Sequence, residues 1–225
     1  MAFSTVRSLD LNTRRDQLRR MLASVLEEPV YLAFASELRM ECDGELAAMS
    51  SPGMSSLIKE AMPDAFRGFA PAMMIVDEPL RRLPQTIAAA VLDAHVVHEA
   101  SHIVNTMHVD KDCPHHGLND LVQTRWQSWP NYSGLPLWST HDLRFVRGLC
   151  HIAHRFESRG HALAMPYTFQ HERYGLSPIE TYQAALGDEP RSTSWLPVRE
   201  VLAKPMPDAF VTLWSQDVVK SLRSN

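Results

Sequence analysis

The most regular pattern of apolar and polar positions along the chain runs from Gln85 to Thr106. Its apolar side chains recur at spacings of three and four residues, which is the pattern of one buried face of an α-helix. Pro84 suits a first helical turn, and the run itself contains neither glycine nor proline. Its polar members gather on a neighbouring face: His95, His98, Glu99 and His102. We therefore expect one long helix with a packed face and, beside it, a face rich in histidine.

Three shorter helices are expected within residues 1–65. Thr13 can cap a helix that runs to about Glu28, because the apolar residues after Thr13 fall on one side of a helix. A second helix is predicted from Val30 to Met40. A third follows Ser51-Pro52, since serine followed by proline is a signal for a helix start. Residues 1–70 are therefore expected to form an N-terminal helical layer.

The segment before the long helix has a different character. Met73-Met74-Ile75-Val76 is a short apolar run between the prolines at positions 71 and 79. A run this short, bounded by proline, suits a β-strand better than a helix. The sequence thus predicts a short β-strand among predominantly helical elements.

The second half of the chain is predicted to add further helices. Ser139-Thr140-His141-Asp142 supplies a cap and an acidic first turn for a helix that ends near Gly160. Ser177-Pro178 starts another helix, which Gly187 closes, and a last amphipathic helix starts around Pro207. Ahead of these helices, interleaved aromatic residues either pack over a core or line a substrate groove: Trp126, Trp129, Tyr132 and Trp138.

Length and composition place these elements in one domain. A chain of 225 residues, with 45% hydrophobic and 21% charged residues, can bury one substantial core. We expect a single domain over residues 1–225, of the α+β class and mainly α-helical. In this division the helical layer of residues 1–70 comes first. A core at residues 71–160 contains the candidate functional site, and C-terminal helices occupy residues 161–225.

Charge and hydropathy exclude several classes of partner. The formal net charge of -4 and the pI of about 6.2 give no general attraction to nucleic acid. No apolar stretch has the length that a bilayer crossing needs, and the first residues lack the apolar core of a secretory signal. The three cysteines, Cys42, Cys113 and Cys150, are odd in number and widely spaced, which argues against a disulfide framework. We therefore expect a cytoplasmic protein that binds neither nucleic acid nor membrane.

The histidine-rich face of the long helix carries the clearest chemical motif, His98-Glu99-Ala100-Ser101-His102. Residues four apart on a helix lie one turn above each other, so His98 and His102 can offer imidazole nitrogens to one metal ion. Glu99 falls beside them, where it can accept a proton from a water molecule that the metal activates. Histidine is frequent in this chain, 11 of 225 residues, so the competing interpretation is two polar side chains near a core. A position inside a helix with an apolar flank favours the metal site.

Through residues 98–102 and their helical context, the chain resembles the zincin superfamily of zinc metallopeptidases. The resemblance implies a zincin-like metallopeptidase domain with a small edge sheet and a bound Zn²⁺. In such a domain, the helix with two metal ligands lies beneath a cleft that is edged by a β-strand, and a third ligand follows further along the chain. The predicted strand at residues 73–76 stands just before the helix, where an edge strand of this kind is expected.

The third metal ligand has several candidates, because a catalytic zinc site takes three protein ligands and leaves one position for water. His141 stands at the start of a predicted helix. Residues 141–147 are also similar to the His-Gly-x-x-Phe segment that supplies this ligand in SprT-like zincins, with Asp142 in place of glycine. His115 or His116, in a turn with Cys113, comes second. The remaining candidates are Glu157, which would follow the zincins with a glutamate ligand, and the pair His151 and His154.

Three further roles are assigned from the sequence. His95 lies one turn before the motif, where it is a candidate for orienting a ligand or a carboxylate. The oxygen that becomes anionic during hydrolysis needs a partner beyond the metal, and four residues are candidates: His151, His154, Arg144 and Tyr132. His161 and His171 are expected to make ordinary hydrogen bonds.

The sequence therefore predicts a zinc-dependent hydrolase that acts on a protein or peptide substrate. Glu99 is its predicted general base, and His98, His102 and His141 are its predicted metal ligands. The alternative from another class is a non-catalytic zincin-like scaffold that binds a partner and holds a structural metal. A site closed by four protein ligands would favour the scaffold, whereas an exposed position for water would favour the enzyme.

Overall fold

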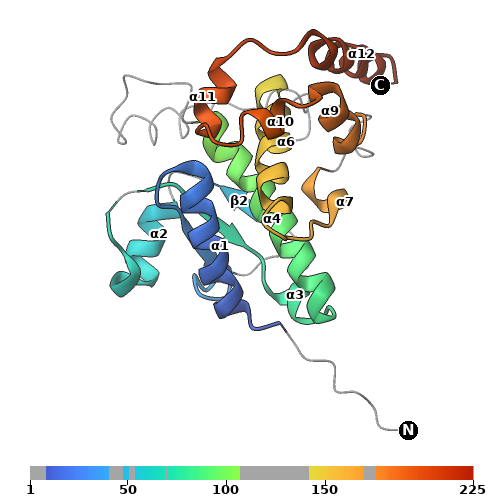
Figure 1. Ribbon diagram of the computed structural model, residues 1–225. Coiled ribbons are helices and arrows are strands. Elements are labelled where there is room, and N and C mark those ends of the chain that lie inside the picture. Colours follow the sequence, from blue (N-terminus) through green and yellow to red (C-terminus); the bar gives the residue numbers. More distant parts are fainter. Residues whose placement is uncertain are drawn as a thin grey trace, which may run out of the picture.

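The computed structural model describes residues 9–40, 48–50, 54–68, 70–106, 142–169 and 176–224. Figure 1 shows the elements, which follow in the order α1 (Leu11–Leu26), β1 (Tyr31–Phe34), β2 (Ala48–Ser50), α2 (Met54–Ala61), the 3-10 turn η1 (Pro63–Ala65), β3 (Ala72–Ile75), α3 (Glu78–Arg81), α4 (Gln85–Thr106), α6 (Leu143–Glu157), α7 (Met165–Thr168), α9 (Ile179–Leu186), α10 (Glu189–Ser192), α11 (Val198–Ala203) and α12 (Asp208–Ser224). Helices dominate this chain and the strands are short, which confirms the mainly α-helical α+β class. Within the described ranges, no helix is both long and apolar enough to span a membrane.

The three strands form one small mixed sheet in the order β1-β3-β2. β1 and β3 are parallel, with Tyr31 opposite Ala72. β2 is antiparallel to β3, with Met49 opposite Met74. The strand that the sequence places at residues 73–76 is therefore present as β3, shifted by one residue.

β3 occupies the centre of the sheet, so its predicted position at the edge of a cleft is wrong. It has a hydrogen-bonded strand on each side, and neither side is free to border a cleft. All four of its residues are buried, which explains why its sequence is continuously apolar rather than alternating. The edge positions belong to β1 and β2.

The helix predicted from Val30 to Met40 is also wrong. The stretch begins with β1, and turns follow it up to Arg39. All four residues of β1 are buried, and so short a buried run has no periodicity that separates a strand from a helix. Residues 1–70 are consequently not a purely helical layer, because they contribute β1 and β2 as well as α1 and α2.

The remaining predicted helices are present, with small differences at their ends. Asp10 rather than Thr13 caps α1, since its carboxylate accepts hydrogen bonds from the N–H groups of Asn12 (3.1 Å) and Thr13 (3.2 Å). α2 is the helix predicted after Ser51-Pro52, and α4 has the predicted bounds. In the second half, α6, α9 and α12 correspond to the helices predicted there.

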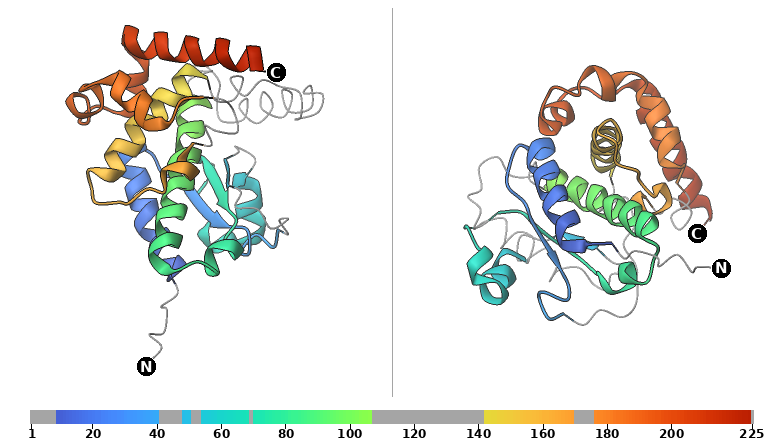
Figure 2. Two further views of the ribbon diagram at one scale, coloured as in Figure 1. Left: turned by 90° about the vertical axis from the view of Figure 1, so that its right-hand side faces the viewer. Right: turned by 60° about the horizontal axis from the view of Figure 1, so that its bottom comes forward.

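The sheet separates two helical layers, as the two views of Figure 2 show. Side chains alternate between the faces of a strand. Those on one face join the large core that α1 and α4 also form: Leu32, Phe34, Met73 and Ile75. Those on the other face pack with Ile58 of α2: Tyr31, Ala33, Ala72 and Met74.

α4 lies in the middle of this arrangement, with the sheet and α1 on one side and α6 on the other (Figure 1). α6 in turn separates α4 from α9, α10 and α11, and α12 packs on α9. The fully buried Arg147 ties α6 to these C-terminal helices. It forms an ion pair with Glu189 of α10 and donates hydrogen bonds to the carbonyls of Lys204 (2.8 Å) and Pro205 (3.1 Å).

Candidate metal centre

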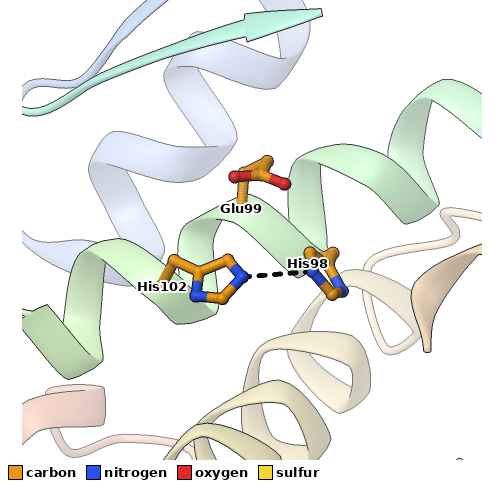
Figure 3. Close-up of side chains that lie close together, drawn as sticks. All are labelled: His98, Glu99 and His102. Atoms are coloured by element: carbon orange, nitrogen blue, oxygen red, sulfur yellow. Dashed lines mark hydrogen bonds between the residues drawn. The ribbon is translucent and has the colours of Figure 1, made fainter. Parts of the chain in front are cut away.

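α4 brings His98, Glu99 and His102 together around one helical turn (Figure 3). The Nε2 atoms of the two histidines lie 3.2 Å apart. One ligand atom from each of the three side chains lies within 4.8 Å of the others. Both histidines are partly exposed, whereas Glu99 is only 4% exposed. The motif therefore places one nitrogen of each histidine and one oxygen of a sheltered carboxylate within 4.8 Å of one another.

The imidazole of His98 is held in one orientation by a residue far away in the chain. Its Nδ1 atom lies 2.8 Å from the carbonyl oxygen of Thr168, at the end of α7. A carbonyl oxygen only accepts hydrogen bonds, so Nδ1 carries the proton and Nε2 keeps a lone pair that faces His102. Burial lowers the pKa of His98, although the hydrogen bond to Thr168 acts in the opposite direction. A neutral imidazole with its proton on Nδ1 and a lone pair on Nε2 is the form that binds a metal.

Phe145 of α6 forms an apolar floor beneath the two histidines. The centre of its ring lies 5.1 Å from that of His98 and 4.4 Å from that of His102. Its carbonyl accepts a hydrogen bond of 2.7 Å from the hydroxyl of Ser101, which stands between the two histidines in the sequence of α4. This floor limits rotation of both rings and keeps water away from one side of them.

The pair of histidines fits a tetrahedral zinc ion. Zinc binds histidine nitrogen at about 2.0–2.1 Å, so two such nitrogens on one tetrahedral ion lie about 3.3 Å apart. The observed separation of 3.2 Å, at which one ring donates a hydrogen bond to the other, is close to this value. In the part of the chain that the structure describes, no further histidine, cysteine or acidic residue joins the group. A third ligand from the described residues is therefore not in place.

The leading candidates for that ligand, His141, His115 and His116, lie outside the described residues. The neighbour of His141 in the chain, Asp142, is described. Its Oδ1 atom accepts hydrogen bonds from Nδ2 of Asn105 (3.2 Å) and from the N–H of Phe145 (2.8 Å). Asp142 thus caps α6 and also ties the start of that helix to α4, three residues beyond His102.

The other candidates on α6 are not part of the group. Glu157 is exposed in the last turn of α6, whereas Phe145 beneath the histidines is in the first. His151 is fully buried, and its Nε2 atom lies 3.3 Å from Glu189 of α10. Burial lowers the pKa of His151, although its contact with Glu189 raises it. His154 is partly exposed on the same helix.

His95 is buried beside the motif without bonding to either histidine of the pair. Its side chain is packed, with the residue 6% exposed, and its Nε2 atom has no hydrogen-bond partner among the residues that the structure describes. Its ring lies 5.8 Å from that of Tyr167. Burial, reinforced by the nearby His98, lowers the pKa of His95 to about 4. The bond that orients His98 comes from Thr168, and not from His95.

The candidates for stabilising an anionic oxygen differ in their surroundings. The Nε2 atom of His151 is in hydrogen-bond contact with Glu189, and Tyr132 lies outside the described residues. Arg144 has two buried nitrogens, Nε and Nη2, without a partner in the described part of the chain. His161 makes an ordinary hydrogen bond of 2.8 Å to the buried Asp93, as predicted, and His171 lies outside the described residues.

The sequence does not predict the contacts of Thr168 and Phe145 with the histidines. Thr168 acts through its backbone carbonyl, which every residue possesses, so no pattern of side chains marks it. Phe145 belongs to the string that is similar to His-Gly-x-x-Phe, and this string is the signal that points to it.

No protein-family model, curated protein or solved structure matches this chain.

Proposed function

We propose that this chain is a zinc-dependent hydrolase, and more narrowly a peptidase, in which His98 and His102 hold the metal and Glu99 is the general base. The observation that carries the proposal is the distance of 3.2 Å between the two Nε2 atoms, which suits two nitrogens on one zinc ion. When bound, zinc supplies a Lewis acid that polarises a carbonyl and lowers the pKa of the attacking water to about 7.

The residues of the chain supply the remaining functions. Glu99 takes the proton of the attacking water and returns it to the leaving amine, because its carboxylate lies within 4.8 Å of the nitrogens of the pair. The bond between His98 and Thr168 holds the lone pair of His98 toward the site. Phe145 shields one side of the site from water, which strengthens electrostatic interactions there.

His141 is the third ligand in this proposal. It directly precedes Asp142, and the bond from Asn105 holds Asp142 against α4 close to the motif. Two histidines from one helix and a third that precedes α6 in the sequence would leave the fourth position of a tetrahedral zinc ion for water, as in catalytic sites. The substrate class is a protein or peptide.

Elemental mass spectrometry and hydrolysis of fluorescein-labelled casein test the proposal on purified variants. The wild type is expected to hold one zinc per chain and to cleave casein, and His98→Ala is expected to lose both properties. Glu99→Gln should keep the zinc and lose a factor of about 10² to 10⁴ in rate. Glu180→Gln, which neutralises an exposed carboxylate on α9, is the matched control and should behave as the wild type does.

Two results would refute the enzyme. If the wild-type protein holds no zinc, even after reconstitution, the proposed metal site is wrong. If Glu99→Gln keeps full activity, Glu99 is not the general base. A wild type that holds zinc but cleaves no substrate would instead support the scaffold with a structural metal.

A further inference from the structure

A short segment after α6, residues 161–169, lies against α4 and contacts it at several points. Nδ1 of His161 lies 2.8 Å from the carboxylate of Asp93, and the N–H of Ala164 donates a hydrogen bond of 3.1 Å to the carbonyl of Ala90. Both contacts lie before the motif on α4. We call residues 161–169 the α7 strap, because it contains α7.

The last residues of the α7 strap lie against the motif itself. The ring of Tyr167 is 5.8 Å from that of His95, one turn before His98. The carbonyl of Thr168 bonds to Nδ1 of His98 at 2.8 Å. Thr168 is fully buried and the next residue, Phe169, is 1% exposed in the large core, so the strap is anchored beyond this contact as well.

We propose that the α7 strap is the positioning element of the candidate metal centre, because it fixes which nitrogen of His98 faces His102. The inference rests on the proposed function, in which His98 is a metal ligand. None of the strap residues is a proposed metal ligand. They act through His98 by holding the Thr168 carbonyl in place.

Within α4, the contact of 3.2 Å between Nε2 of His98 and Nε2 of His102 can be made with the proton on either nitrogen, so α4 alone does not determine the tautomer of His98. A neutral imidazole exists as two tautomers, and only the one with its proton on Nδ1 leaves the lone pair on Nε2. The Thr168 carbonyl selects this tautomer and holds the ring. Loss of a partner of this kind typically weakens metal binding by about 10- to 100-fold.

Two substitutions loosen the strap at different points and leave every proposed ligand in place. Ala164→Pro removes the N–H that bonds to Ala90, and the φ angle of -79° at this residue is compatible with proline. Ala164→Ser keeps the N–H and is its control. Tyr167→Ala removes the ring beside His95, and Tyr167→Phe keeps that ring. Tyr167 is 40% exposed, so its substitution does not open the core.

Two measurements on the full chain read out the effect. Nitrogen-15 NMR of the metal-free protein reports the tautomer of His98, assigned by its absence in His98→Ala. Competition with a chromophoric chelator measures the affinity for Zn²⁺. The wild type and both controls should show a proton on Nδ1 of His98. Ala164→Pro and Tyr167→Ala should show a mixture of tautomers and at least about 10-fold weaker Zn²⁺ binding.

The outcomes separate this inference from the proposed function. If both loosened variants keep the Nδ1 tautomer and the wild-type affinity, or if the wild type itself lacks that tautomer, the positioning role is wrong. If the wild type binds no Zn²⁺, the proposed function fails. The tautomer measurement, which needs no metal, then still decides whether the strap orients His98. Tyr167→Ala and its phenylalanine control decide the question by themselves if Ala164→Pro does not fold.

Discussion

Gly148 of α6 lies so close to Ser101 of α4 that a Cβ atom at position 148 would be 3.1 Å from the Ser101 hydroxyl oxygen. The same hydroxyl bonds to the carbonyl of Phe145, whose ring forms the floor under His98 and His102. The distance between α4 and α6 at this point therefore also sets how far the Phe145 ring lies from His98 and His102.

Gly148→Ala should lower the free energy of unfolding in the wild type and raise it in a Ser101→Ala background. Glycine within a helix costs about 1 kcal/mol relative to alanine, so Gly148→Ala gains helix propensity but crowds Ser101 in the wild type. In a Ser101→Ala background the crowding is absent, and the gain of up to about 1 kcal/mol should appear. Urea denaturation of the four proteins measures the coupling. Additive effects within about 0.3 kcal/mol would show that the two residues do not crowd each other.

His95 should make stability depend on pH. Burial lowers its pKa from 6.5 to about 4 in the folded protein. Between these values the unfolded chain binds the proton more readily, so the free energy of unfolding falls as the pH is lowered from about 6.5 towards 4. The full effect is on the order of 3 kcal/mol.

Urea denaturation at several pH values tests this expectation with His95→Phe, which removes the titrating group. The variant should lose less stability than the wild type over that range. His154→Phe, at a partly exposed histidine of α6, controls for the loss of one imidazole. An unchanged pH dependence in His95→Phe would assign the acid sensitivity to other groups.

The ion pair between Arg147 and Glu189 should respond unequally to the loss of either partner. The Arg147 side chain is fully buried, whereas that of Glu189 is 16% exposed. Glu189→Ala leaves a buried cation without its carboxylate and should lower the free energy of unfolding by about 3–5 kcal/mol. Arg147→Met leaves a carboxylate that water can reach, so its cost should be smaller. Chemical denaturation measures both, and a larger loss in Arg147→Met would contradict this explanation.

The third ligand can be identified by the zinc content of single variants. His141→Ala should lose zinc as completely as His98→Ala does, whereas Glu157→Gln should retain it, because Glu157 is exposed at the far end of α6. Zinc that is retained in His141→Ala but lost in His115→Ala or His116→Ala would move the ligand to that turn. Circular dichroism of each variant separates loss of metal from loss of fold.

Local spacing explains which parts of the fold are predictable. α4 follows from the sequence because its apolar and polar faces repeat over many turns. β1 does not, because four buried residues carry no period. The central position of β3 depends on pairing with β1 and β2, which lie well before it in the chain. A local pattern contains no information on such pairing.

The candidate site divides in the same way. His98, Glu99 and His102 share one helix, so their proximity follows from helical geometry alone. The contact of His98 with Thr168 joins residues 70 positions apart and uses a backbone carbonyl. Only the tertiary fold brings that carbonyl to the imidazole.

The bond between Asn105 and Asp142 has an evolutionary consequence. These residues are 37 positions apart along the chain, yet their side chains meet at 3.2 Å, so the connection between them leaves and returns at one place. The contact joins the last turn of α4 to the cap of α6, so a substitution at either residue removes the hydrogen bond that holds these two points together. We expect related chains to keep the two residues as a pair or to change both together.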